Sequence, residues 1–193
     1  MAKLKAFSED VVLDKAIEIF WYKGYNGTSA QDLVNHLGLS RSSLYDTFGD
    51  KRSLFIKALE RYQNKSLNVL KTALETADDV KLAIKQIFEQ AAVESFQDSL
   101  TKGCFMVNTS VELAIHDTDI AAIVNKNRIK IEAVFLYAIE RGQDKGQISK
   151  AISALALARF LFNNYSGIRV LSRSVINDKY VMQDIVKVIS DVL

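Results

Sequence analysis

An arginine and several hydroxyl side chains stand close together in one stretch of this 193-residue chain, HLGLSRSSLYDTFGDK at residues 36–51. Within it, a short helix has only two large apolar anchors, Leu44 and Phe48, which leaves most of its surface exposed. Arginine can fork onto the O6 and N7 acceptors of guanine, and serine can bond to a base edge or to a phosphate. These residue types predict direct contacts with a nucleic acid. The residues expected to contact bases are Arg41, Ser42 and Ser43.

Residues on both sides of this group have the chemistry to hold a phosphate backbone. Tyr45 lies one turn further along and can donate its hydroxyl to a phosphate. Lys51 is expected at a helix N-terminus, where its ammonium and the free backbone N–H groups together attract an anion. Thr28, Ser29 and Gln31 stand at the front of the preceding helix and are predicted to grip the same backbone.

Helix signals show which elements must position these residues. Thr28 and Gln31 fit a capping box that starts a short helix, and Gly38 ends it. Ser40 can then cap a second short helix over residues 41–48. Two short helices joined by a tight turn have the proportions of a helix-turn-helix, in which the second helix enters the major groove of DNA.

The rest of the chain is predicted to be helical as well. It contains no proline and only eight glycines, and 49% of its residues are hydrophobic, which is ample for a core. Period-2 runs typical of strands are hard to find. The sequence therefore predicts an all-α protein. About nine helices are expected, near residues 8–24, 28–38, 41–48, 51–76, 80–97, 103–115, 117–142, 151–171 and 181–192.

The last two expected helices carry more apolar surface than one face can hold. In residues 152–171, Leu157 and Ile168 belong to one apolar stripe, whereas Leu155 and Phe162 belong to another. A helix that is apolar on several faces must be covered on several faces. A further stripe follows in residues 181–192, made of Val181, Ile185, Val188, Ile189 and Val192.

The N-terminal residues resemble a known family. The run GYNGTSAQDLVNHLGLSRSSLYDTFGDKRSLF, with FWYKGY ahead of it, is similar to the DNA-binding head of the TetR/AcrR transcriptional regulators over residues 8–60. The resemblance implies a homodimer in which residues 1–50 form a three-helix DNA-binding head. Residues 51–193 then form a helical body that binds a small-molecule inducer and pairs through its last two long helices.

The same resemblance implies which residues meet the operator. Asp46 departs from the family pattern, since many relatives carry an aromatic residue or histidine there, and an acid would repel phosphate or prefer a cytosine amino group. The positions that commonly meet DNA in the family are Ser29, Gln31, Arg41, Ser42, Ser43, Tyr45, Thr47 and Lys51.

A weaker resemblance covers residues 102–114, KGCFMVNTSVELA, which are similar to a G-C-x-x-x-N segment of one branch of these regulators. Cys104 has two interpretations. Free cysteine is among the most buried residue types, which indicates a half-buried structural role. Alternatively, the helix N-terminus and Lys102 favour a thiolate that oxidants or electrophiles could modify.

Aromatic residues of the body are candidates for an inducer cavity, although the same pattern fits an ordinary hydrophobic core. Asn108, Thr109 and Asn163 would supply its polar contacts. The aromatic candidates are Phe88, Phe105, Phe135, Phe162 and Tyr165.

Several other classes of function are disfavoured. A net charge of +2 is too small to indicate a polyanion partner by itself, so DNA binding must depend on the local pattern. One cysteine excludes an internal disulfide, and His36 and His116 do not suggest a metal site. We find no catalytic triad, phosphate-binding glycine loop, signal peptide or membrane span, and expect a cytoplasmic protein without cofactor.

The sequence thus predicts a ligand-responsive repressor that an inducer releases from a palindromic, double-stranded operator. Two alternatives remain: a transcriptional activator of the same fold, or a small-molecule-binding helical protein or enzyme without DNA binding.

Overall fold

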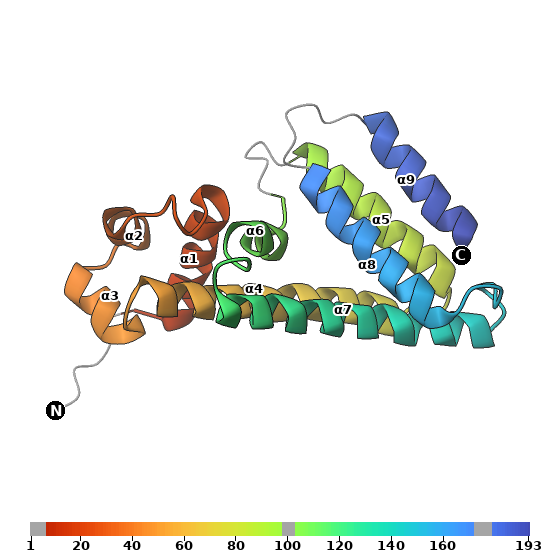
Figure 1. Ribbon diagram of the computed structural model, residues 1–193, viewed down its shortest axis with the longest axis horizontal. Helices are drawn as coiled ribbons and strands as arrows, with labels where there is room; N and C mark the ends of the chain where they lie inside the picture. Colours follow the sequence, from red (N-terminus) through yellow and green to blue (C-terminus); the bar gives the residue numbers. More distant parts are fainter. Residues whose placement is uncertain (1–6, 98–102, 172–178) are drawn as a thin grey trace.

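The computed structural model describes residues 7–97, 103–171 and 179–193, which form nine α-helices and no strand within these ranges (Figure 1). This confirms the predicted all-α class. The helices are α1 (Glu9–Lys23), α2 (Ala30–Leu37), α3 (Arg41–Phe48), α4 (Lys51–Glu75), α5 (Val80–Gln97), α6 (Phe105–Glu112), α7 (Thr118–Asp144), α8 (Ala154–Leu171) and α9 (Lys179–Val192).

Most helix starts follow from local side-chain caps. The Ser40 hydroxyl caps α3 by accepting from the Ser43 N–H at 3.1 Å, and the Asp50 carboxylate caps α4 in the same way. The predicted capping box at α2 was wrong by one residue. It is formed by Ser29 and Asp32, whose N–H groups donate to each other's side chains at 2.9 and 3.1 Å.

Thr28 instead stabilises the turn before α2. Its side chain is fully buried, and its hydroxyl donates to the Gly24 carbonyl at 2.6 Å. Threonine and serine both satisfy the first position of a capping box, and Thr28 and Ser29 each have an acceptor three residues further on. The sequence pattern alone therefore could not choose between them.

The molecule has two hydrophobic cores joined by the two longest helices. One core unites α1, α2 and α3 with the first half of α4, and Phe105 and Met106 of α6 and Ile120 of α7 belong to it. The other core lies in the body, where the far ends of α4 and α7 pack with α5, α8 and α9. The head is thus held to the body by apolar packing as well as by the chain.

Ion pairs add to the packing of α1 along α4. The Arg61 guanidinium donates to the Asp14 carboxylate at 2.8 Å, and the Lys65 ammonium donates to it at 2.6 Å. These hydrogen bonds, from Arg61 first and then Lys65, hold the pKa of Asp14 well below its usual range.

Helices α4 and α7 lie side by side and parallel, and they span the length of the molecule (Figure 1). With 25 and 27 residues, they are about 37 and 40 Å long. At the head end, Arg52 of α4 binds Asp117, the N-cap of α7. At the far end, Arg141 of α7 donates to the Leu74, Glu75 and Ala77 carbonyls at the end of α4. We call this pair the α4–α7 strut.

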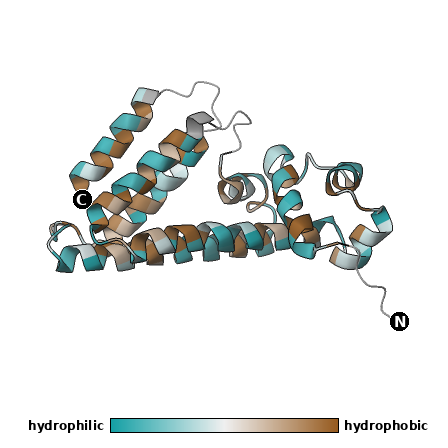
Figure 2. Ribbon diagram, turned by 180° about the vertical axis from the view of Figure 1, so that it is seen from behind, coloured by the Kyte–Doolittle hydropathy of each residue, from teal (hydrophilic) through white to brown (hydrophobic). Residues whose placement is uncertain are grey.

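Helices α5, α8 and α9 form a layer over the far half of the strut (Figure 1). Leu157 and Ile168 of α8 are buried as predicted, but Leu155 is 43% exposed, and the end of the helix also shows Val170 at 51%. In α9, one face is buried against the body, whereas Val188 on the other face is 54% exposed. Apolar segments therefore remain uncovered on the outer helices of a single chain (Figure 2).

Two further points concern the body. Gly142 lies inside α7. Ile148 and Val80 pack so closely against it that a Cβ would lie 2.7 Å from an Ile148 methyl carbon, which explains why this position is a glycine. None of the helices, as far as the chain is described, is long and apolar enough to cross a membrane.

Candidate nucleic-acid interface

The α2–α3 unit is anchored from one side only. Leu33 and Leu37 of α2 and Leu44 and Phe48 of α3 are buried in the head core. The turn between the two helices contains Gly38 in the left-handed conformation, with φ +69°, which permits the sharp change of direction. The opposite surface of α3 is left open to solvent.

Arg41 and Ser42 are exposed in the first turn of α3. The Arg41 guanidinium lies 6.0 Å from the ring of Tyr45, one turn further on, and forms no ion pair with the described residues. Its N–H donors are therefore not held by an acid and can reach a base edge. Position, charge and exposure make Arg41 the best placed of the predicted base contacts.

The serines of this turn are partly engaged with the cap. The Ser42 hydroxyl lies 3.1 Å from that of Ser40, and the Ser40 hydroxyl donates to that of half-buried Ser43 at 2.9 Å. A base or phosphate would have to share these hydroxyls with the cap. Thr47 is half-buried in the last turn of α3, and Asp46 is exposed beside it.

The residues predicted at the front of α2 divide between surface and core. Ser29 and Gln31 are exposed, although the Ser29 hydroxyl bonds to Asp32 and the Gln31 amide donates to Asn35 at 2.9 Å. Thr28 was wrongly predicted to grip DNA, because its buried hydroxyl is directed to a backbone carbonyl of its own chain.

Lys51 starts α4 as predicted, but its ammonium does not project freely. It lies 4.3 Å from the ring centroid of Tyr25, and burial lowers the pKa of Lys51, while the charges of Glu112 and Asp32 act in the opposite direction. A phosphate at the N-terminus of α4 would replace or extend this contact with the ring.

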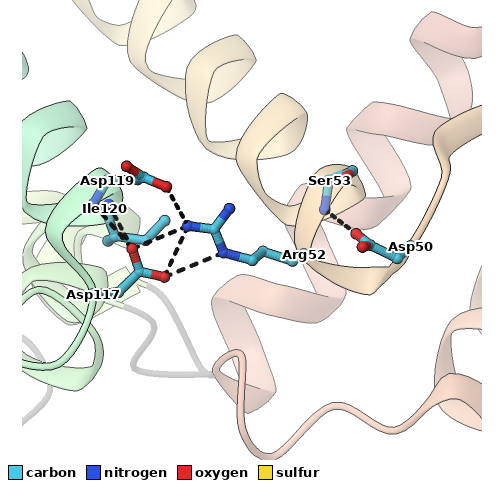
Figure 3. Close-up of polar contacts among 6 residues, drawn as sticks. All are labelled: Asp50, Arg52, Ser53, Asp117, Asp119 and Ile120. Atoms are coloured by element: carbon cyan, nitrogen blue, oxygen red, sulfur yellow. Dashed lines mark hydrogen bonds and ion pairs between the residues drawn. The ribbon is translucent and has the colours of Figure 1, made fainter.

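The next residue, Arg52, connects the start of α4, which packs in the same core as α1–α3, to the start of α7. Arg52 binds both oxygens of Asp117 at 3.0 Å, and its guanidinium also reaches Asp119 at 2.9 Å (Figure 3). The Asp117 carboxylate also accepts a hydrogen bond from the Ile120 N–H (Figure 3). This hydrogen bond, and after it the one from Arg52, keeps the pKa of Asp117 below its usual value. We call this contact the Arg52 link.

A carboxylate at the end of α6 makes a second connection. Glu112 accepts hydrogen bonds from the backbone N–H groups of Tyr25 at 3.1 Å and Asn26 at 2.7 Å, in the turn after α1. The approach requires Gly24, since a Cβ there would lie 2.8 Å from a Glu112 oxygen. This contact, the Glu112 link, and the Arg52 link flank the short segment between α6 and α7. Neither link was predictable from local sequence patterns, because each joins residues more than 60 positions apart.

Comparison with known proteins identifies the family. The family model described as "Bacterial regulatory proteins, tetR family" matches residues 12–58. A protein of Bacillus subtilis (strain 168), named "Uncharacterized HTH-type transcriptional regulator YezE", is 36% identical over 162 residues, which cover 83% of this chain and 84% of YezE. The chain belongs to the tetR family of bacterial regulatory proteins.

Other relatives of this tetR-family regulator agree. The HTH-type transcriptional repressor ComR of Escherichia coli (strain K12) is 29% identical over 180 residues, covering 93% of this chain and 86% of ComR. A cysteine mutant of the regulator CifR, complexed with a 26-bp operator DNA, has a TM-score of 0.85 at 20% identity over 98% of each chain. Reduced E. coli NemR has a TM-score of 0.83 at 18% identity over 95% of each chain. The two structures share its fold.

Three of the predicted ligand residues of this tetR-family regulator come together. Cys104, Phe162 and Tyr165 line a cavity of about 360 Å³ between α6, α7 and α8. The Tyr62 hydroxyl donates to the Cys104 sulfur at 3.7 Å, and burial raises the pKa of Tyr62 well above its usual value. We call this space the α6–α7–α8 cavity.

The other predicted ligand residues lie elsewhere. Phe88 and Phe135 are fully buried in the body core, where they pack behind Tyr165. Asn163 is exposed on α8 and lines none of the described cavities, so its contact with a ligand stays a prediction. A separate cavity of about 390 Å³ between α1 and α6 is lined by Phe105, Asn108 and Thr109.

Proposed function

We propose that this chain acts as a homodimeric repressor that a small-molecule inducer releases from a palindromic double-stranded operator. In this proposal residues 1–50 are the DNA-binding head and residues 51–193 the ligand-binding and dimerisation body, and the protein acts in the cytoplasm at the nucleoid. The observation that carries it is the exposed Arg41, which forms no ion pair with the described residues, at the start of α3, a helix anchored from one side only.

The head would place α3 in a major groove. Arg41 would read a guanine there, and Ser42, Ser43, Tyr45 and Lys51 would add base-edge or phosphate contacts. Ser29, Gln31 and Thr47 would support them from α2 and the end of α3. A symmetric dimer presents two such helices, and their half-sites would lie one DNA turn, about 34–36 Å, or a multiple of it apart.

The dimer would form through α8 and α9. Val181 and Val188 occupy one outer face of α9, and Leu155 and Val170 are exposed on α8, with each side chain between 43% and 54% exposed. Exposed apolar side chains aligned along two long helices are typical of a surface that a second subunit covers.

The inducer would act through the corner between α6 and α7. Both helices line the α6–α7–α8 cavity, and the same corner carries the Glu112 link and the Arg52 link to the head. A ligand that binds one position of α6 more tightly than another would change the tilt of the head. Only this difference in affinity between two states is needed for release.

The proposal is tested by selecting bound sequences from random duplexes with the purified full-length protein. We expect an inverted repeat, and we expect Arg41→Ala to lose the preference at one position of each half-site. Expression of a reporter gene controlled by the selected sequence should rise when the protein is removed. Recovery of no sequence would refute DNA recognition, and a fall in reporter expression would make the protein an activator.

A further inference from the structure

The α6–α7–α8 cavity has an unusual balance of charge. Among the described residues that line it are Arg128 and Arg169, whereas no described aspartate or glutamate does. Arg128 is neutralised from outside the cavity, because it donates to Glu132 at 2.6 Å. Most other lining positions are apolar or aromatic, including Met106 and Phe162. The cavity is thus a largely apolar space with two arginines in its wall, each paired with a glutamate that lies outside it.

Arg169 is the more buried of the two arginines. Only 20% of its side chain is exposed, and it also lines a second cavity of about 530 Å³ beside α4 and α5. Its guanidinium donates to the Tyr165 hydroxyl at 2.9 Å, and its Glu94 partner, at 3.4 Å, lines the second cavity and not the first. Arg169 therefore borders a cavity that does not contain its paired carboxylate.

Tyr165 supplies a second polar group at the same place. It lines both cavities, and its ring lies 5.0 Å from the Arg169 guanidinium carbon, which fixes the orientation of the fork. Burial raises the pKa of Tyr165, so that its hydroxyl keeps its proton near neutral pH. The hydroxyl accepts from Arg169 and can still donate to a ligand.

We infer that the α6–α7–α8 cavity binds an amphipathic organic anion, a molecule with one carboxylate and an apolar body, with the carboxylate on Arg169 and Tyr165. This inference rests on the proposed function, of which it specifies the inducer class. The planar guanidinium matches a carboxylate geometrically, and the apolar wall around Met106 and Phe162 accommodates the rest of the molecule. No described aspartate or glutamate lines this cavity to receive a cationic ligand.

The cavity position also connects ligand binding to the head. Its lining includes Val111 of α6, Ala114 in the turn after α6 and Ala121 of α7, and these residues flank Glu112 and Asp117 in the sequence. An anion drawn toward Arg169 of α8 places its apolar body between α6 and α7. Any adjustment of these helices is then transmitted through the Glu112 link and the Arg52 link.

The inference is tested with matched acids and amides. Full-length protein is titrated with decanoate and 2-naphthoate, and in parallel with decanamide and 2-naphthamide, by calorimetry and by the fluorescence of Trp21, the single tryptophan, which lines the second cavity. We expect at least one acid to bind at least tenfold more tightly than its amide. This comparison uses the unmodified protein and does not depend on how a variant folds.

Variants then assign the preference to Arg169. Arg169→Gln should bring acid and amide to within about twofold, which corresponds to less than about 0.5 kcal/mol, and Arg169→Lys should restore part of the difference. Lys126→Gln is the control, because Lys126 is exposed on α7 next to the lining residues Asn125 and Asn127. It removes one positive charge near the cavity and should leave the preference unchanged.

Equal binding of acid and amide, no binding of either acid up to about 1 mM, or an acid preference that survives in Arg169→Gln would each overturn the inference. Operator affinity is measured separately, with and without the acids. If the acid binds through Arg169 but operator affinity is unchanged, the ligand class stands and the inducer role in the proposed function fails. If the protein alone binds no operator, only the proposed function fails.

Discussion

Gly24 and Glu112 offer a sharp test of the contact between head and body. Gly24 has φ +76° and ψ 171°, a combination that is open essentially to glycine alone. Gly24→Ala should therefore cost about 1–3 kcal/mol of unfolding free energy from backbone strain. The new Cβ would also lie 2.8 Å from a Glu112 oxygen, so that the carboxylate must shift relative to its two N–H donors.

The loss of this link has its own magnitude. Hydrogen bonds to charged groups contribute more than neutral ones, but these two lie near solvent, so we assign about 1–2 kcal/mol to the pair. Glu112→Ala should cost this amount alone, and Gly24→Ala about 2–5 kcal/mol in total. Since the link can be lost only once, the double variant should cost about 1–2 kcal/mol less than the sum of the single variants.

Urea unfolding at one fixed protein concentration measures all three variants. Gly38→Ala is the matched control, because Gly38 also has a positive φ, +69°, but a Cβ there would meet no atom within 4 Å. It should cost about 1–2 kcal/mol and add to Glu112→Ala within about 0.5 kcal/mol. The contact as described would be refuted if the costs of Gly24→Ala and Glu112→Ala were additive. It would also be refuted if Gly38→Ala combined with Glu112→Ala cost less than the sum of its two single variants by a similar amount.

The remaining predictions concern the operator, acid and the dimer. Arg41→Ala should lose about 1–3 kcal/mol of binding free energy at one base pair of the operator. Lys51→Ala should weaken binding to all DNA sequences alike and reduce the slope of log affinity against log salt concentration by about one. In anisotropy titrations at several salt concentrations, equal losses of affinity on specific and random DNA for both variants would show that these roles are wrong. The lowered pKa of Asp14 stabilises the fold at pH values above its unfolded pKa of about 3.9, and this contribution is lost as the pH falls toward the folded pKa. Asp14→Asn should therefore flatten the fall in unfolding free energy that urea unfolding measures below about pH 5. A constant difference in unfolding free energy between the wild type and the variant across this pH range would contradict the prediction. Val188→Asp should give a monomer in light scattering, whereas Val11→Asp, also more than half exposed but on α1, should stay dimeric; two dimers would exclude the α9 face.

The predictable parts of the fold were those set by neighbouring residues. Ser40, Asp50 and Asp117 each accept an N–H two or three positions ahead, and a cap of this kind is written in consecutive residues. The prediction of the α2 cap was wrong only in the choice between Thr28 and Ser29, because the burial of a hydroxyl depends on packing that the local sequence pattern does not contain.

The site was predictable where exposure follows from composition. A helix with two apolar anchors had to expose Arg41, and it does. The links at Arg52 and Glu112 could not be found, because a charged residue on a helix surface has the same pattern whether or not a distant partner faces it. For the same reason the aromatic residues could not be divided in advance between cavity wall and core: Phe162 borders open space, and Phe135 does not.

The α4–α7 strut limits how a signal can travel through the molecule. Two parallel rods fastened by an arginine at each end resist both sliding and independent bending, so the unit turns as one piece. Because the head sits near the end of a rod about 37 Å long, a rotation of about 5° around the opposite end carries the recognition helix sideways by about 3 Å. Two copies turning in opposite senses would alter their separation by about 6 Å, a large mismatch for half-sites set by the pitch of DNA. A small rotation of the whole strut is therefore enough to move the recognition helix out of register.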